Sequence, residues 1–272
     1  MNWFESWFDT EYYHMLYRHR SDTEAREFLG NLMRHLGLQQ GDRVADIGCG
    51  KGRHSMVLAE MGLNVWGMDL SSNSIQIAEN LRQERNLKNV EFSVHDMRLP
   101  YPVGSLSAVF NLFTSFGYFD NDLDDRKSLQ NMFDALQPGG YLVQDYLNAG
   151  PLLRNSDGGI IQPLTWTEFD GVQFGTEKWV DKGVIYKRIL VADGRKSEPT
   201  GEGSNAKDGG IQNAVNSECM EFREEVKLYT MDELLGLHRS ANFEIQGIFG
   251  GYNLSEFLEE SSGRMIVISK KR

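Results

Sequence analysis

Cysteine is scarce in this sequence: Cys49 and Cys219 are the only two in 272 residues. They lie far apart without a CxxC spacing, so they provide neither a disulfide framework nor a cysteine-based metal site. Long apolar runs are also missing, since no stretch approaches the roughly 18 to 20 residues that a membrane-spanning helix needs. The start, MNWFESWFDTEYYHMLYRHR, is aromatic and acidic, unlike a secretory signal. These absences indicate a soluble cytoplasmic protein with no membrane partner.

Basic residues are outnumbered. The chain has 28 Lys and Arg against 39 Asp and Glu, which gives a formal net charge of −11 and a pI of about 5.1. A field of this sign repels phosphate backbones, so we expect no general nucleic-acid binding. The balance favours a small-molecule or protein substrate. Nothing in the sequence specifies an oligomeric state.

Short β-branched or aromatic runs alternate with longer amphipathic stretches between residues 41 and 147, which is typical of βαβ units in a parallel sheet. A capping-box sequence, TMDE, at 230–233 predicts one further helix near the end of the chain. The expected fold is α/β, with helices on both faces of a mostly parallel sheet. The expected strands are 43–47, 64–69, 90–95, 108–112, 141–145, 244–249 and 264–269, and the expected helices are 52–60, 72–85, 122–136 and 230–240.

The segment 152–229 has a different character, because polar and aromatic residues alternate in it as in antiparallel strands. Within it, 192–217 is rich in Gly, Ser, Asn and charge, which predicts a long mobile loop, either a lid or a solvated insertion. We therefore expect four parts: an N-terminal helical cap (1–40), a cofactor-binding core (41–151), a β insertion (152–229), and a helix with strands that complete the sheet (230–272).

The stretch VADIGCGKGRH, residues 44–54, places a glycine-rich turn directly after a strand. Glycines at such a turn let a ligand approach the backbone closely. Gly48, Gly50 and Gly52 form GxGxG, whereas the dinucleotide motif GxGxxG would need a glycine at Arg53. A P-loop is excluded too, because no Ser or Thr follows the lysine. A carboxylate at Asp46 suits a ligand that is cationic at this end.

Two further acids close the next two strands. Asp69 follows the glycine turn at the interval where nucleotide-binding folds place an acid that accepts the ribose hydroxyls. Asp96 closes the third strand and is placed to accept from an adenine amino group. The side chains of Leu70 and Met97, with the Met97 backbone, are expected to flank the ring.

In this order the motifs resemble those of the class I S-adenosylmethionine-dependent methyltransferases. The resemblance covers residues 40–148, and a narrower one, to bacterial small-molecule methyltransferases with a β-rich insertion, extends over the rest. It implies a Rossmann-like, seven-stranded sheet, S-adenosyl-L-methionine as cofactor, and a methyl acceptor between the ends of the fourth and fifth strands and the insertion. The motifs that carry it are VADIGCGKGRHS, VWGMDLS, VHDMRLP, AVFNLFTSFGYF and LQPGGYLVQDYLN.

The resemblance also implies roles for single residues. The backbone of Gly48 and Gly50 approaches the methionine part of the cofactor, and Asp46 lies near its amino group. Asn111 and Leu112 lie beside the sulfonium, although Asn111 is equally suited to satisfying loop backbone.

The N-terminal helix is expected to close over the cofactor. Tyr13 and Arg18 are its candidates for the methionine carboxylate, because charge-assisted hydrogen bonds suit that group. Tyr13 and Tyr17 are also i, i+4 neighbours that would pack a helix onto a core.

Methyl transfer needs a general base only when the acceptor atom carries a proton. The candidates are Asp145, Tyr118, Tyr146 and His54, of which Asp145 is expected to be the most exposed to the crevice. His54 also reads as a scaffold residue and the two tyrosines as pocket walls.

No metal is expected. A magnesium site of the catechol methyltransferase type needs an acid just after the fourth strand, where Asn111, Thr114 and Ser115 stand. The other histidines, among them His238, show no ligand spacing and are expected to be scattered surface or helix residues.

Two alternatives stay open at this point. One is a non-catalytic module that binds S-adenosylmethionine; the other is a nicotinamide-dependent oxidoreductase, which the missing GxGxxG ending disfavours. The sequence does not define which acceptor atom, N, O, C or S, receives the methyl group.

Overall fold

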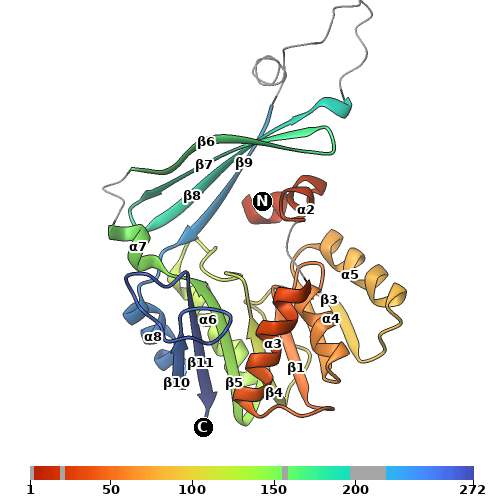
Figure 1. Cartoon of the computed structure of the whole chain (residues 1–272). Helices are drawn as coiled ribbons and strands as arrows, with labels where there is room; N and C mark the ends of the chain where they lie inside the picture. Colours follow the sequence, from red (N-terminus) through yellow and green to blue (C-terminus); the bar gives the residue numbers. More distant parts are fainter. Residues whose placement is uncertain (1–2, 19–21, 155–158, 197–218) are drawn as a thin grey trace, which may run out of the picture. The chain divides into compact units, whose positions relative to one another are not determined.

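The computed structural model describes residues 3–18, 22–154, 159–196 and 219–272 (Figure 1). They fall into two compact units, and each is built from two separate parts of the chain. The core unit combines Arg20–Arg154 with Lys227–Arg272, and the insertion unit combines Met1–His19 with Asn155–Val226.

The core unit contains a seven-stranded sheet with the strand order β10-β11-β5-β4-β1-β2-β3. The strand β11 runs antiparallel to both of its neighbours, and the other pairs are parallel. This confirms the expected mostly parallel sheet. Its strands are β1 (Arg43–Ile47), β2 (Asn64–Asp69), β3 (Val90–Val94), β4 (Leu106–Asn111), β5 (Leu136–Leu147), β10 (Phe243–Phe249) and β11 (Arg264–Lys271).

The strand β5 begins earlier than the expected residue 141, because Leu136 already pairs with Leu106 across a register shift. The turn sequence QPGG therefore lies inside a strand that runs along β4. A short helix that the sequence reading did not include, α7 (Ala149–Arg154), follows directly.

The core-unit helices are α3 (Asp22–Leu36), α4 (Arg53–Glu60), α5 (Ser72–Glu84), α6 (Asp122–Ala135) and α8 (Met231–Ser240). Three of the core-unit helices, α5, α6 and α8, begin at polar caps. The side chains of Ser71, Asn121 and Thr230 accept main-chain N–H groups at the starts of their helices, and Thr230 with Glu233 forms the expected capping box.

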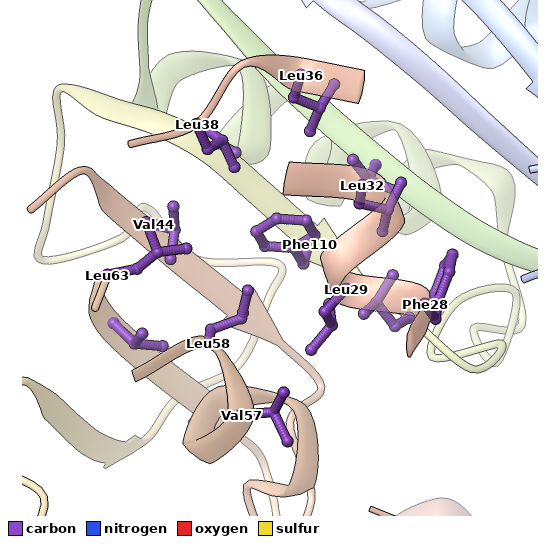
Figure 2. Packing of buried hydrophobic residues seen from close by; sticks show 14 of the residues in the cluster. Phe28, Leu29, Leu32, Leu36, Leu38, Val44, Val57, Leu58, Leu63 and Phe110 are labelled. Carbon is purple, nitrogen blue, oxygen red and sulfur yellow. The ribbon is translucent and has the colours of Figure 1, made fainter. Parts of the chain in front are cut away.

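The main core lies between α3, α4 and one face of the sheet. On α3, Phe28, Leu29 and Leu32 recur at helical spacing and pack toward Phe110 of β4 and Val44 of β1 (Figure 2). All five are at most 2% exposed. Fully burying such a side chain contributes roughly 1.5 to 3 kcal/mol to folding. The strand residues next to these point to the opposite face of the sheet. On that face, α8 contacts β10 and β11, and α6 contacts β5 and α8.

The insertion unit is a four-stranded sheet with the strand order β6-β7-β8-β9, together with two N-terminal helices. Trp7, Tyr12 and Leu16 of the helices form one buried cluster with Phe174 and Ile189 of the sheet. The elements are β6 (Ile160–Phe169), β7 (Val172–Asp181), β8 (Val184–Asp193), β9 (Met220–Lys227), a 3-10 turn (Gly194–Lys196), α1 (Trp3–Trp7) and α2 (Glu11–Leu16).

Partly buried polar contacts join the helices to the sheet of this unit. Glu224 of β9 accepts hydrogen bonds from Trp7 Nε1 at 2.7 Å and from the Tyr17 hydroxyl at 2.8 Å. The Tyr12 hydroxyl donates to Asp193 at 2.9 Å. These contacts link residues about 200 positions apart in the chain.

The expected grouping of residues 1–40 therefore differs from the structure. The helices α1 and α2 pack on the antiparallel sheet through aromatic side chains, whereas α3 packs on the core unit through leucines. The expected loop 192–217 lies mostly outside the described residues. Its first residues complete β8 and the 3-10 turn at Gly194–Lys196.

Candidate cofactor site

The glycine turn leads from the end of β1 into α4. Gly48, Gly50 and Gly52 have φ values of 74°, 54° and 76°, in the left-handed region that only glycine adopts at low cost. The turn is closed by main-chain bonds, since the N–H groups of Gly48 and Cys49 both donate to Met68 O of β2.

The glycines differ in what a side chain would meet. A Cβ on Gly48 would lie 2.5 Å from the Cβ of Ser115, and one on Gly52 would lie 2.5 Å from the ring of Phe92. A Cβ on Gly50 would meet no atom within 4 Å. Gly48 and Gly52 are thus required by packing, whereas Gly50 presents its backbone to open space. This is the cradle that a closely approaching ligand needs.

Asp69, at the end of β2, is bonded to that cradle. Its carboxylate accepts from the Gly50 N–H at 2.8 Å and from the Ser71 N–H at 2.9 Å. A carboxylate only accepts hydrogen bonds, and ribose hydroxyls can donate to such a group. The geometry at Gly50 and Asp69 therefore fits an adenosine-type cofactor.

Asp46 lies on β1, two residues before Gly48, and is 1% exposed. Its carboxylate accepts from the Ser55 hydroxyl at 2.6 Å. Burial raises the pKa of Asp46 to about 6, and the nearby negative charge of Asp69 contributes to the rise, against the lowering effect of Ser55. A cationic group beside Asp46 would stabilise its ionised form, which suits the predicted neighbour, the cofactor's amino group.

Asp96 follows β3, where the adenine was expected. Both of its oxygens accept from the Arg98 guanidinium, and one also accepts from the Arg98 N–H. Burial alone would raise the pKa of Asp96, but the hydrogen bonds from Arg98 outweigh it and lower the pKa. An adenine amino group would have to share this carboxylate with Arg98. Nearby, Leu70 is 37% exposed and Met97 is half-buried, as expected of residues available to flank a ring.

A strained turn follows β4. Phe113 and Thr114 have φ values of 60° and 62°, which are unfavourable for residues other than glycine. Asn111 is fully buried, and its amide donates to Ile47 O at 3.0 Å and to Ser115 O at 3.1 Å. Of the two roles considered for Asn111, the structure shows the satisfaction of loop backbone. Leu112 is 2% exposed and belongs to the main core.

Asp145 stabilises this turn. Its side chain accepts from the Phe113 N–H at 2.9 Å and from Arg264 Nε at 2.7 Å, and its main-chain O accepts from the Thr114 N–H. The Tyr252 hydroxyl donates to the same carboxylate at 3.3 Å. Asp145 is 1% exposed, so the expectation that it is the most exposed candidate base is wrong. Its side chain faces a turn and the partly buried Arg264 instead of solvent.

The other base candidates lie in different surroundings. Tyr146 is fully buried, its hydroxyl donates to Lys227 O, and burial raises the pKa of its phenol well above the usual range. Tyr118 is half-buried and donates to Thr114 O. His54 is half-buried beside Arg53, with 3.0 Å between His54 Nε2 and Arg53 Nη2.

Tyr13 and Arg18 belong to the insertion unit. The Tyr13 ring packs against Trp7 and Tyr17, with ring centroids 5.7 and 5.0 Å apart. Arg18 pairs with Asp170 and lies over the Phe169 ring. Their predicted role toward the methionine carboxylate remains a prediction.

Sequence reasoning missed two contributors to the site, Arg264 and Ser115. Arg264 comes from β11, 119 positions after Asp145, and no local pattern marks it. The Ser115 hydroxyl donates to Gly48 O at 3.2 Å and to Leu112 O at 2.9 Å, so it joins the two turns. The signal for Ser115 is its place in the SFGYF run after the fourth strand.

Within the described ranges, no group of three or more His, Cys, Asp or Glu side chains could hold a metal ion. In the same ranges, no helix combines the length and apolar character required to cross a bilayer. Cys49 and Cys219 are both free thiols.

Comparison with known proteins agrees with this geometry. The family model described as "Methyltransferase domain" matches residues 38–185. A demethylmenaquinone methyltransferase of Geobacillus sp. (strain WCH70) is 28% identical over 117 residues, which is 41% of this chain and 47% of that protein. The match thus spans about half the length of the curated relatives.

Solved structures match almost the whole chain. An S-adenosylmethionine-dependent methyltransferase from Clostridium acetobutylicum superposes with a TM-score of 0.74 at 16% identity, over 96% of each chain. CalS10, an amino pentose methyltransferase from Micromonospora echinaspora solved with bound S-adenosylmethionine, superposes with a TM-score of 0.65 at 20% identity, over 97% of this chain and 98% of its own.

The fold and the glycine turn define a Rossmann-like methyltransferase architecture, and S-adenosylmethionine is the cofactor of this class, as the sequence predicted. The chain belongs to the methyltransferase domain family. Both the expected fold class and the expected family are confirmed.

Proposed function

We propose that this protein transfers a methyl group from S-adenosylmethionine to a small-molecule acceptor in the cytoplasm. The observation that carries the proposal is the pairing of Gly50 with Asp69. An added Cβ on Gly50 would meet no atom within 4 Å, and the carboxylate of Asp69 accepts from the Gly50 N–H.

The bound cofactor would supply an activated methyl group on a sulfonium, which is a good leaving group. The chain's own contribution is then binding and alignment, which can supply much of the rate acceleration. Asp69 is assigned to the ribose and Asp46 to the amino group. Gly48 and Gly50 are assigned to the methionine part, and Asp96, Leu70 and Met97 to the adenine.

A general base is not required for every acceptor. Asp145 and Tyr146 are fully engaged inside the fold, so we assign them structural roles. Tyr118 and His54 are the half-buried candidates, and they remain the ones to test when the acceptor carries a proton.

The names of similar proteins support a small acceptor. One relative is named for demethylmenaquinone and one solved structure for an amino pentose. The net charge of −11 repels nucleic-acid backbones and favours neutral or cationic acceptors. The roles of Tyr13, Arg18 and the insertion toward the ligands stay predictions from the sequence resemblance.

Calorimetry tests the cofactor first. We expect S-adenosylmethionine and its demethylated product S-adenosylhomocysteine to bind, and Asp69→Ala to abolish the signal. Binding of a nicotinamide dinucleotide without binding of either of these ligands would overturn the proposal.

Transfer is tested next, with the label in the methyl group of the cofactor and a metabolite extract as the source of acceptors. We expect the label to appear in a small molecule, and we expect this transfer to depend on an intact Gly50. Binding without transfer to any fraction of the extract would favour the non-catalytic module.

A further inference from the structure

A row of hydrogen-bonded, buried polar side chains runs through the core unit and ends next to the cofactor turn. It consists of Ser269 on β11, His238 on α8, Gln144 on β5 and Asn111 on β4, and each of the four side chains is fully buried. We call it the buried relay. His238 was expected among the scattered surface or helix residues. It lies on a helix, but it is not at the surface.

The relay is continuous. Ser269 Oγ lies 2.7 Å from His238 Nδ1, and His238 Nε2 lies 2.7 Å from Gln144 Oε1. Gln144 Nε2 then donates to Asn111 Oδ1 at 3.2 Å. Every side-chain nitrogen and oxygen in the relay therefore has a partner, as buried polar groups require.

The relay ends at the two turns of the candidate site. The main-chain pairing of β1 with β4 stops at Asp46 and Phe110. One residue further on, the Asn111 side chain takes over and donates to Ile47 O and to Ser115 O. Ile47 directly precedes the glycine turn, so the relay ends at the residue before that turn.

The donor and the acceptor in each hydrogen bond of the relay can be deduced from the main-chain carbonyl groups of Ile47 and Ser115. Because a carbonyl oxygen only accepts, Asn111 must present its NH₂ to Ile47 and its oxygen to Gln144. Gln144 must then donate to Asn111 and accept from His238. His238 consequently carries its proton on Nε2, and its Nδ1 accepts from the Ser269 hydroxyl.

We propose that His238 is a positioning residue for the cofactor turn, acting through Gln144 and Asn111. Without a donor at this position, Gln144 is free to rotate its amide, and Asn111 loses the partner that orients it toward Ile47 O. This inference rests on the proposed function, because it takes the glycine turn as the cofactor site.

The test separates positioning from stability. His238→Leu removes the donor at similar volume, and His238→Gln restores an amide N–H toward Gln144. Leu234→Ala is the matched control, because Leu234 lies on the same helix, is fully buried and takes part in none of the hydrogen bonds of the relay. The dissociation constant for S-adenosylhomocysteine is measured by calorimetry, and the melting temperature is measured without ligand.

We expect His238→Leu to weaken binding about tenfold, since a buried acceptor is left without its donor. We expect His238→Gln to recover most of this affinity. Leu234→Ala should lower the melting temperature while binding stays within about twofold of wild type. If His238→Leu does not fold, Gln144→Met interrupts the relay one link closer to the turn and should give the same loss.

The inference is overturned if a folded His238→Leu or Gln144→Met protein binds as tightly as wild type. It is also overturned if Leu234→Ala loses as much affinity as His238→Leu. Failure of the wild-type protein to bind S-adenosylhomocysteine would overturn the proposed function as well, so the two failures are distinguishable.

Discussion

Replacing Gly50 by alanine tests the cofactor site with little harm to the fold. The new methyl group would point into space where no atom lies within 4 Å. Only the backbone conformation opposes it, because φ is 54°. A left-handed alanine costs roughly 1 to 2 kcal/mol, and reduced freedom of the unfolded chain offsets about 0.4 to 1 kcal/mol. The net loss of about 1 kcal/mol should lower the melting temperature by roughly 2 to 4 °C.

Binding should respond far more strongly than stability. A ligand that approaches the Gly50 backbone has to move away from the added methyl group and loses hydrogen bonds worth about 1 to 3 kcal/mol. We therefore expect the affinity for S-adenosylhomocysteine to fall by about 5- to 150-fold. Calorimetry measures the affinity, and circular dichroism measures the melting temperature of the same preparation.

Gly52→Ala is the matched control. It has a similar φ of 76°, but its methyl group would lie 2.5 Å from the Phe92 ring. Overpacking adds about 1 to 3 kcal/mol to the strain, so stability should fall clearly further than in Gly50→Ala. The affinity of the folded fraction should change less than in Gly50→Ala. The reasoning is refuted if Gly50→Ala binds within twofold of wild type, or if the two variants show the same pattern.

Three further predictions concern buried charge. Burial lowers the pKa of His238 from 6.5 to about 3, so below pH 6.5 the unfolded chain binds a proton that the folded chain does not. Stability should then fall by up to about 1.4 kcal/mol per pH unit toward pH 3, and urea unfolding of His238→Gln should show a shallower slope. The pKa of Asp46 is raised to about 6, so binding of the cationic cofactor at pH 5.5 should release protons. Calorimetry in buffers of different ionisation enthalpy measures this proton release. Asp46→Asn should abolish it. Asp145→Asn leaves the partly buried Arg264 without its ion-pair partner and should lower the free energy of unfolding in urea by up to about 3 kcal/mol. A loss of turnover with unchanged stability would show instead that Asp145 is a base.

Much of the core unit was predictable because its signals are local. The strands β1, β2 and β10 follow apolar runs with clear ends, and the capping box at Thr230 appears as written in the sequence. The glycine spacing predicted the position of the turn after β1 for the same reason. A strand, a turn and a helix start lie within about a dozen residues.

What the sequence did not reveal depends on partners that are distant along the chain. The burial of Asp145 follows from Arg264 of β11, and the role of His238 follows from Gln144, 94 positions earlier. A residue's own type and spacing carry no record of such partners. The division of the N-terminal helices has the same origin, because α2 is held by Glu224 and α3 by the main core.

The insertion unit has a consequence for synthesis of the protein. Its helices are made before its sheet, and β9, the strand whose Glu224 accepts from Trp7 and Tyr17, follows about 200 residues later. At about 5 to 20 residues per second, the aromatic side chains of α1 and α2 wait roughly 10 to 40 s for their partner strand. During that interval they are candidate binding sites for a chaperone on the ribosome, while the strands of the core unit are already emerging.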